Sequence, residues 1–252
     1  MKVAILCGGR GTRIRGVDEN LPKAMIPVGE KPILQHIMNH YDRSGHREFV
    51  LCVGFRSEHI INYFSNIATL VSREERLHVF EYVGLLGEKC QVSVVDTGLE
   101  TMTGGRLYQS REFLNQSTFF LTYGDGLSDV NLEALFDFHE KSESTMTLTA
   151  VYPPARFGEV RFDSSGLVSA FNEKPQASGG RISGGFFVCK PDIFGYLRDD
   201  PELVLETIPM QQMVKDERLS AYQHDGFWQC MDTFRDWELL NQYSRDGKLP
   251  WL

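Results

Sequence analysis

One stretch near the start of the chain carries residue types suited to binding a polyphosphate. The segment 8–13 reads Gly-Gly-Arg-Gly-Thr-Arg and directly follows the apolar run 3–7, and Lys23 comes shortly afterwards. Glycines let the backbone turn tightly and bring its N–H groups within reach of an anion. Arg13 and Lys23 add positive charge beside those donors, and the fork of an arginine suits phosphate oxygens in particular. The spacing therefore predicts a polyphosphate site.

The glycines of segment 8–13 could instead form an ordinary surface turn after a strand, which is how most glycine-rich turns are used. The segment lacks the Gly-Lys-Ser/Thr ending of a P-loop, which argues against magnesium-assisted hydrolysis of that type. It also lacks the third glycine of the dinucleotide-binding fingerprint, which argues against an NAD-dependent dehydrogenase. A phosphate site here would belong to another kind of fold.

Two aspartates stand where they could hold a divalent cation. Asp125 ends an apolar run between Gly124 and Gly126, and Asp232 directly precedes Thr233. Mg²⁺ commonly takes one or two carboxylates together with substrate phosphates and water. Each aspartate has a plain structural alternative, as a turn residue at 125 and as a helix N-cap at 232. Because ligand sites in open α/β sheets lie beyond the carboxyl ends of the strands, we expect Asp125 to converge with segment 8–13.

The apolar pattern predicts the elements that must position these residues. Strands are expected at 3–7, 49–53, 91–95, 118–123, 146–152 and 219–223. Helices are expected from Pro32 to a stop at Gly45, from an N-cap at Ser57, after a turn at Gly104-Gly105-Arg106, at 133–141, 192–197 and 208–215, and from 233 onward. The alternation of strand and helix predicts parallel pairing.

From Pro153 onward the pattern changes to short strands, at 158–162, 168–171 and 183–189, separated by turn residues. We expect these strands to form a small antiparallel β cap, packed on a doubly wound, mainly parallel sheet. The chain is therefore predicted to be an α/β protein. No linker separates its parts, so we expect one domain, 1–252, with halves at 1–152 and 153–252.

Composition narrows the range of partners. A net charge of −8 argues against non-specific binding to nucleic acid, which needs an excess of Lys and Arg facing phosphates. The five cysteines contain no Cys-x-x-Cys and look like small buried residues of a reduced compartment. No apolar stretch approaches the ~20 residues needed to span a bilayer. We therefore expect a cytoplasmic protein that binds neither nucleic acid nor membrane.

Short motifs follow one another along nearly the whole chain: GGRGTR at 8–13, GEKPIL at 29–34, DTG at 96–98, MTGGR at 102–106, TYGDG at 122–126, RFG at 156–158, EKP at 173–175, GGFFV at 184–188, and GFWQ with DT between 226 and 233. In type and order they resemble those of the sugar-1-phosphate nucleotidyltransferase family, and most closely its cytidylyltransferase group. One departure lies near Lys23. The family usually has Lys-Pro-Lys-Pro there, whereas this chain has Leu21 and Ala24 in place of the first Lys and the second Pro.

The resemblance implies the nucleotide-diphospho-sugar transferase-like fold and magnesium-dependent transfer of a cytidylyl group from CTP to a hexose 1-phosphate, glucose 1-phosphate first of all. The products would be a CDP-sugar and pyrophosphate. It also implies a homo-oligomer, such as a hexamer, with nucleotide binding in the half 1–152 and sugar binding in the half 153–252. Three alternatives stay open: another sugar phosphate as the acceptor, UTP or dTTP in place of CTP, and a catalytically silent sugar-nucleotide sensor. The sensor is kept because loss of a cation beside Lys23 could weaken triphosphate binding.

The resemblance also gives roles to single residues. The catalytic set is Arg13, Lys23, Asp125, Lys174 and Asp232, with Asp125 and Asp232 as the Mg²⁺ ligands. Nucleotide binding falls to Leu6, Cys7, Gly8, Gly9, Arg10, Gly11, Thr12, Arg13, Lys23, Thr101, Arg106 and Gly124. Sugar-phosphate binding falls to Glu173, Lys174, Gly184 and Gly185. Taken alone, Arg106 could equally be a helix-start arginine facing water, whereas for Lys174 the sequence alone favours a solvated turn lysine.

Overall fold

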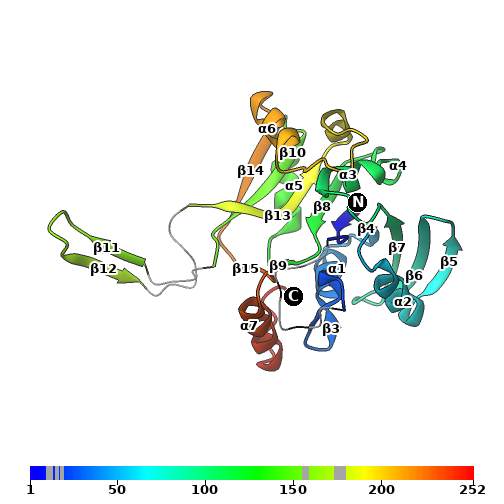
Figure 1. The fold of residues 1–252 in the computed structure, drawn as a ribbon, viewed down its shortest axis with the longest axis horizontal. Helices are drawn as coiled ribbons and strands as arrows, with labels where there is room; N and C mark the ends of the chain where they lie inside the picture. The colour runs from blue at the N-terminus through cyan, green and yellow to red at the C-terminus, as the bar shows by residue number, and fades with distance from the viewer. Residues whose placement is uncertain (10–13, 15–16, 18–19, 155–158, 173–179) are drawn as a thin grey trace.

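A nine-stranded sheet forms the centre of the molecule (Figure 1). The computed structural model describes residues 1–9, 14, 17, 20–154, 159–172 and 180–252. The strands lie in the order β14 (Leu219–His224), β10 (Met146–Val151), β13 (Ile182–Cys189), β8 (Phe119–Tyr123), β1 (Lys2–Leu6), β4 (Glu48–Val53), β7 (Lys89–Asp96), β6 (Leu77–Val83) and β5 (Thr69–Arg73). Only β13 and β6 run against the others, so the sheet is mixed but mostly parallel.

Helices cover both faces of this sheet. They are α1 (Ile33–Arg43), α2 (Ser57–Ile67), α3 (Thr103–Gln109), α4 (Arg111–Leu114), α5 (Leu132–Lys141), α6 (Ile208–Lys215) and α7 (Phe234–Arg245), with 3₁₀ turns η1 (Lys23–Met25) and η2 (Pro191–Tyr196). Because successive side chains of a strand point to opposite faces, β1 contributes to two cores. Val3 and Ile5 pack with α1, α2 and α5, whereas Ala4 and Leu6 pack with α3, α4 and α6. The predicted doubly wound α/β fold is therefore confirmed.

Three small antiparallel pairs complete the structure. They are β2 (Pro27–Val28) with β3 (Lys31–Pro32), β9 (Gly126–Ser128) with β15 (Trp228–Cys230), and β11 (Glu159–Phe162) with β12 (Val168–Asn172). The hairpin of β11 and β12 projects far from the sheet in Figure 1. Within the described part of the chain, no helix combines the length and apolar character needed to cross a membrane.

The predicted cap is smaller than expected. Residues 183–189 were assigned to it, and that prediction was wrong: β13 lies inside the main sheet, antiparallel to both β10 and β8. From Gly184 to Cys189 every residue is buried, because both faces of this strand are covered. Of the three short strands, only β11 and β12 form a separate antiparallel unit.

Two local predictions about helix starts were also wrong. Ser57 is not an N-cap: it is the first residue of α2, and the capping position belongs to Arg56, a non-glycine residue at φ 51° with no side-chain capping bond. Gly104 and Gly105 do not form a turn ahead of a helix but lie inside α3. A Cβ at Gly105 would lie 2.7 Å from the carbonyl oxygen of Asp200, so the glycine serves close approach of another segment.

Candidate active site

Pairing of β9 with β15 brings Asp125 and Asp232 together. Asp125 directly precedes β9, and Asp232 lies just beyond the end of β15. In the antiparallel register Cys230 faces Gly126, and the N–H of Met231 donates to the carbonyl of Asp125 at 2.9 Å. Two carboxylates far apart in sequence therefore stand at one end of the same small ladder.

The ammonium of Lys23 lies between these two carboxylates. Its Nζ is 2.6 Å from Oδ2 of Asp125 and 2.5 Å from Oδ1 of Asp232, and its side chain is only 14% exposed. Burial lowers the pKa of Lys23, but the charge of Asp125 and hydrogen bonds to both aspartates outweigh it, so the pKa of this amine lies above its usual value. Lys23 is therefore held in its charged form.

The same pair of carboxylates suits a divalent cation. Both already converge on one positive charge, and carboxylate oxygens are the ligands that Mg²⁺ prefers. Among the described residues no cluster of three or more His, Cys, Asp or Glu side chains could hold a metal. A site of two carboxylates is still sufficient for Mg²⁺, because substrate phosphates and water complete its coordination.

The end of β1 meets the end of β8 beside this pair. The N–H of Gly124 donates to the carbonyl of Leu6 at 3.0 Å, and a Cβ at Gly124 would lie 2.9 Å from Cβ of Cys7. Asp125 therefore lies beside the start of the glycine-rich segment. The side chains of Leu6 and Cys7 are buried, and burial raises the pKa of the Cys7 thiol, so only their backbone can face a ligand.

Arg106 ties together the ends of three strands. The residue as a whole is only 4% exposed, so the alternative of a water-facing arginine was wrong. It donates five hydrogen bonds of 2.7 to 3.1 Å, to the carbonyls of Gly8, Val53, Gly98 and Leu99 and to the hydroxyl of Thr97. A Cβ at Gly8 or Gly54 would come within 2.3 Å of this guanidinium, so these glycines make room for it.

The remaining residues predicted to bind the nucleotide or the sugar phosphate are described only in part. Thr101 lies half-buried against Gly98, whose φ is +91°. Gly9 is exposed. The predictions for Arg10, Gly11, Thr12, Arg13, Glu173 and Lys174 lie outside the described residues.

Gly184 and Gly185 admit two aromatic side chains. Gly185 has φ +77°, and a Cβ there would lie 2.3 Å from the ring of Tyr123. The indole N–H of Trp228 donates to the carbonyl of Gly184 at 2.7 Å. Because neither glycine has a side chain, Tyr123 and Trp228 can pack directly against their backbone.

A cavity of about 1490 Å³ adjoins part of this arrangement. Asp125 and Asp232 line it together with Gly184 and Trp228. Its wall also includes three residues to which the sequence reading gave no role: Thr103, Tyr123 and Glu206. Thr103 lies within the MTGGR motif and Tyr123 within the TYGDG motif. Glu206 lies in none of the family motifs, so nothing in the sequence pointed to it.

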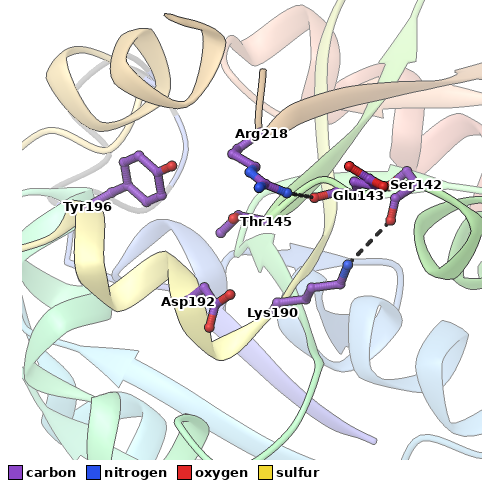
Figure 2. Close-up of a pocket in the computed structure, with 7 residues that line it drawn as sticks. All are labelled: Ser142, Glu143, Thr145, Lys190, Asp192, Tyr196 and Arg218. Atoms are coloured by element: carbon purple, nitrogen blue, oxygen red, sulfur yellow. Dashed lines mark hydrogen bonds between the residues drawn. The ribbon is translucent and has the colours of Figure 1, made fainter. Parts of the chain in front are cut away.

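A second recess, of about 450 Å³, is lined by the seven residues drawn in Figure 2. Lys190 and Arg218 donate to the backbone carbonyls of Ser142 and Glu143, at 3.3 and 2.6 Å. The carboxylates of Glu143 and Asp192 line the same recess and balance its two cations. None of the predicted site residues that the structure describes lines it.

Comparisons with known proteins show the family and the fold. Residues 2–241 match the sequence model of a family described as nucleotidyl transferase. Over its whole length the chain is 37% identical to a probable glucose-1-phosphate cytidylyltransferase of Bacillus subtilis (strain 168), covering 99% of that protein. It is 39% identical to the glucose-1-phosphate cytidylyltransferase of Salmonella typhi, covering all of this chain and 98% of that one. A solved UDP-glucose pyrophosphorylase complexed with UDP-glucose shares the fold, with a TM-score of 0.71 at 18% identity, covering 98% of this chain and 99% of that one.

Replacing Arg106 tests its structural role. We expect Arg106→Leu to lower the free energy of unfolding by about 3 kcal/mol or more, because several buried carbonyls would lose their donor. Urea unfolding followed by circular dichroism measures this, with Arg43→Leu, an exposed arginine of α1, as the control. Equal stability of Arg106→Leu and Arg43→Leu would contradict the assignment.

Proposed function

The chain belongs to the nucleotidyl transferase family, and we propose that it transfers a cytidylyl group from CTP to a hexose 1-phosphate, with glucose 1-phosphate as the first candidate. The observation that carries this proposal is the convergence of Asp125 and Asp232, which both line one large cavity, on the ammonium of Lys23. The choice of CTP and glucose 1-phosphate is supported by the names of the two relatives that match the whole chain.

The reaction brings two anions into contact. An oxygen of the sugar phosphate attacks the α-phosphorus of CTP, and the bond to the departing pyrophosphate breaks. Little covalent work falls to the protein, so fixed charge and alignment supply most of the rate. In our proposal Lys23 binds the α-phosphate. Family resemblance further suggests Arg13 for the pyrophosphate and Lys174 for the sugar phosphate.

We propose that Asp125 and Asp232 hold Mg²⁺ during turnover. When bound, the ion would neutralise part of the triphosphate charge. The ammonium of Lys23 now lies between the two carboxylates, so it must leave them when a metal is held there. Turning toward the α-phosphate would give Lys23 a new anionic partner. Metal binding and nucleotide binding would in this way be coupled through one side chain.

The activity itself is tested with a matrix of substrates. We expect pyrophosphate release from CTP and glucose 1-phosphate with Mg²⁺, and none in excess EDTA. Asp125→Asn and Asp232→Asn should each lower kcat by about a hundredfold or more, because each weakens the hold on the Mg²⁺ whose charge would stabilise the transition state. Asp137→Asn, an exposed position of α5, is the control.

The other nucleoside triphosphates and sugar 1-phosphates complete the matrix. Faster release from UTP or dTTP, or from another hexose 1-phosphate, would replace the proposed substrate. Absence of release with every pair, under Mg²⁺, would overturn the proposed function and favour a sensor.

Metal binding without nucleotide gives a separate test of Lys23. We expect Lys23→Met to bind Mn²⁺ at least about tenfold more tightly than the wild type in the absence of CTP, because a competing positive charge is removed. Mn²⁺ titration followed by electron paramagnetic resonance measures this. Lys31→Met, an exposed lysine of β3, should leave the affinity unchanged. Unchanged or weaker Mn²⁺ binding by Lys23→Met would show that the ammonium does not compete with the metal.

We also propose a cytoplasmic homo-oligomer, with the hexamer suggested by family resemblance. Five free cysteines support a reducing compartment. The hairpin of β11 and β12 exposes apolar side chains, with Val160 at 47%, Phe162 at 67% and Val168 at 54%, and such patches often mark contacts between chains. Light scattering coupled to gel filtration should give a mass of several chains. A monomer at micromolar concentration would contradict this proposal.

A further inference from the structure

The carboxylate of Glu206 is held by two hydroxyl groups at the wall of the large cavity. The hydroxyl of Thr103 donates to its Oε2 at 2.6 Å, and the phenol of Tyr123 donates to its Oε1. The three residues come from the start of α3, the end of β8 and the segment before α6, and all three line the cavity. Glu206 is itself an exposed residue, so its carboxylate is fixed in direction while still open to a ligand.

Tyr123 is placed by the absence of a side chain at Gly185. A Cβ at Gly185 would overlap the tyrosine ring, which also packs edge-on against Phe187 with ring centres 5.6 Å apart. The phenol of Tyr123 is thereby directed at the carboxylate of Glu206, to which it donates its hydrogen bond.

A carboxylate held in this way can still accept further hydrogen bonds. Its two oxygens offer about four acceptor positions, of which Thr103 and Tyr123 use one each. Neutral hydroxyl groups are suitable donors, whereas a phosphate would be repelled by the like charge. The ligand facing Glu206 should therefore be an uncharged, hydroxyl-bearing part of a substrate.

Both the hexose and the ribose of a nucleotide carry hydroxyls, and the surroundings favour the hexose. Tyr123 connects Glu206 directly to Gly185, beside Gly184 on the cavity wall. The segment expected to bind the nucleotide, by contrast, begins at the end of β1, where Arg106 occupies the neighbouring space. Glu206 thus stands between the start of α3 and the side of the cavity formed by β8 and β13.

We propose that Glu206 is a specificity-determining residue that accepts hydrogen bonds from hydroxyls of the hexose, with Tyr123 and Thr103 as positioning residues. This inference rests on the proposed function and names a contact of the same site. A site built to hydrogen-bond a substrate hydroxyl discriminates strongly against an analogue that lacks it, because its own polar group is then left unpaired. The carboxylate should therefore help to select among sugar 1-phosphates.

Steady-state kinetics with CTP and glucose 1-phosphate test the contact. We expect Glu206→Gln to raise KM for glucose 1-phosphate about tenfold or more, since a charged acceptor is replaced by a neutral amide, while KM for CTP stays within about twofold. Glu202→Gln is the matched control, because Glu202 is an exposed glutamate of the same segment and does not line the cavity. A rise confined to KM for CTP, or no change in either KM, would overturn the proposal.

Deoxy analogues identify the hydroxyl. With 2-, 3-, 4- and 6-deoxyglucose 1-phosphates, the ratio of kcat/KM between wild type and Glu206→Gln should fall close to one for at least one analogue, because the contact is already missing. A ratio that stays equal for glucose 1-phosphate and for all four analogues would contradict a contact with the sugar.

The positioning residues give an independent readout. Tyr123→Phe and Thr103→Val should raise KM for glucose 1-phosphate by a smaller factor than Glu206→Gln, with KM for CTP unchanged. A purely structural role would instead lower thermal stability without this split between the two KM values. If the wild type turns over no substrate pair, the proposed function fails; if it does and Glu206→Gln behaves as wild type, only this inference fails.

Discussion

The site depends on keeping two carboxylates together, and this requires a cation between them. Asp125 and Asp232 both lie within 2.6 Å of the ammonium of Lys23 in a partly buried position. Without a positive charge there, two like charges would repel each other at close range. The backbone pairing of β9 with β15 fixes where the carboxylates stand, whereas the identity of the cation is free to change. In our account this exchange, from ammonium to Mg²⁺, links metal binding to substrate binding.

The rest of the fold fixes the strand ends around that pair. Arg106 hydrogen-bonds to the ends of β1, β4 and β7, and glycines at 8 and 54 give its guanidinium room. On the other side of β1, Gly185 gives room to Tyr123. A side chain at any of these glycines would overlap Arg106 or Tyr123. Arg106 and Tyr123 therefore fix neighbouring strand ends on the two sides of Asp125 and Asp232.

The sequence predicted most where a strand is covered on both faces. The run 49–53 and its neighbours are continuously apolar, so the central strands and the α/β class could be recognised. Strand β5 could not be recognised from the sequence, because all of its residues are exposed and charges interrupt the apolar pattern. β13 was misplaced because local pattern does not reveal a partner strand. The positions of Asp125 and Asp232 followed from flanking glycines and family motifs, but the ion pair with Lys23 and the role of Glu206 depend on contacts between distant segments.

The central claim is that one position accepts either the ammonium of Lys23 or a divalent metal. A crystal structure with CTP and Mn²⁺, analysed by anomalous scattering at the manganese edge, tests it most directly. The account predicts one anomalous peak bound by both Asp125 and Asp232, with Nζ of Lys23 turned away from them to a phosphate oxygen. A peak that contacts neither aspartate, or an ammonium that still bridges both carboxylates beside bound CTP and Mn²⁺, would contradict it.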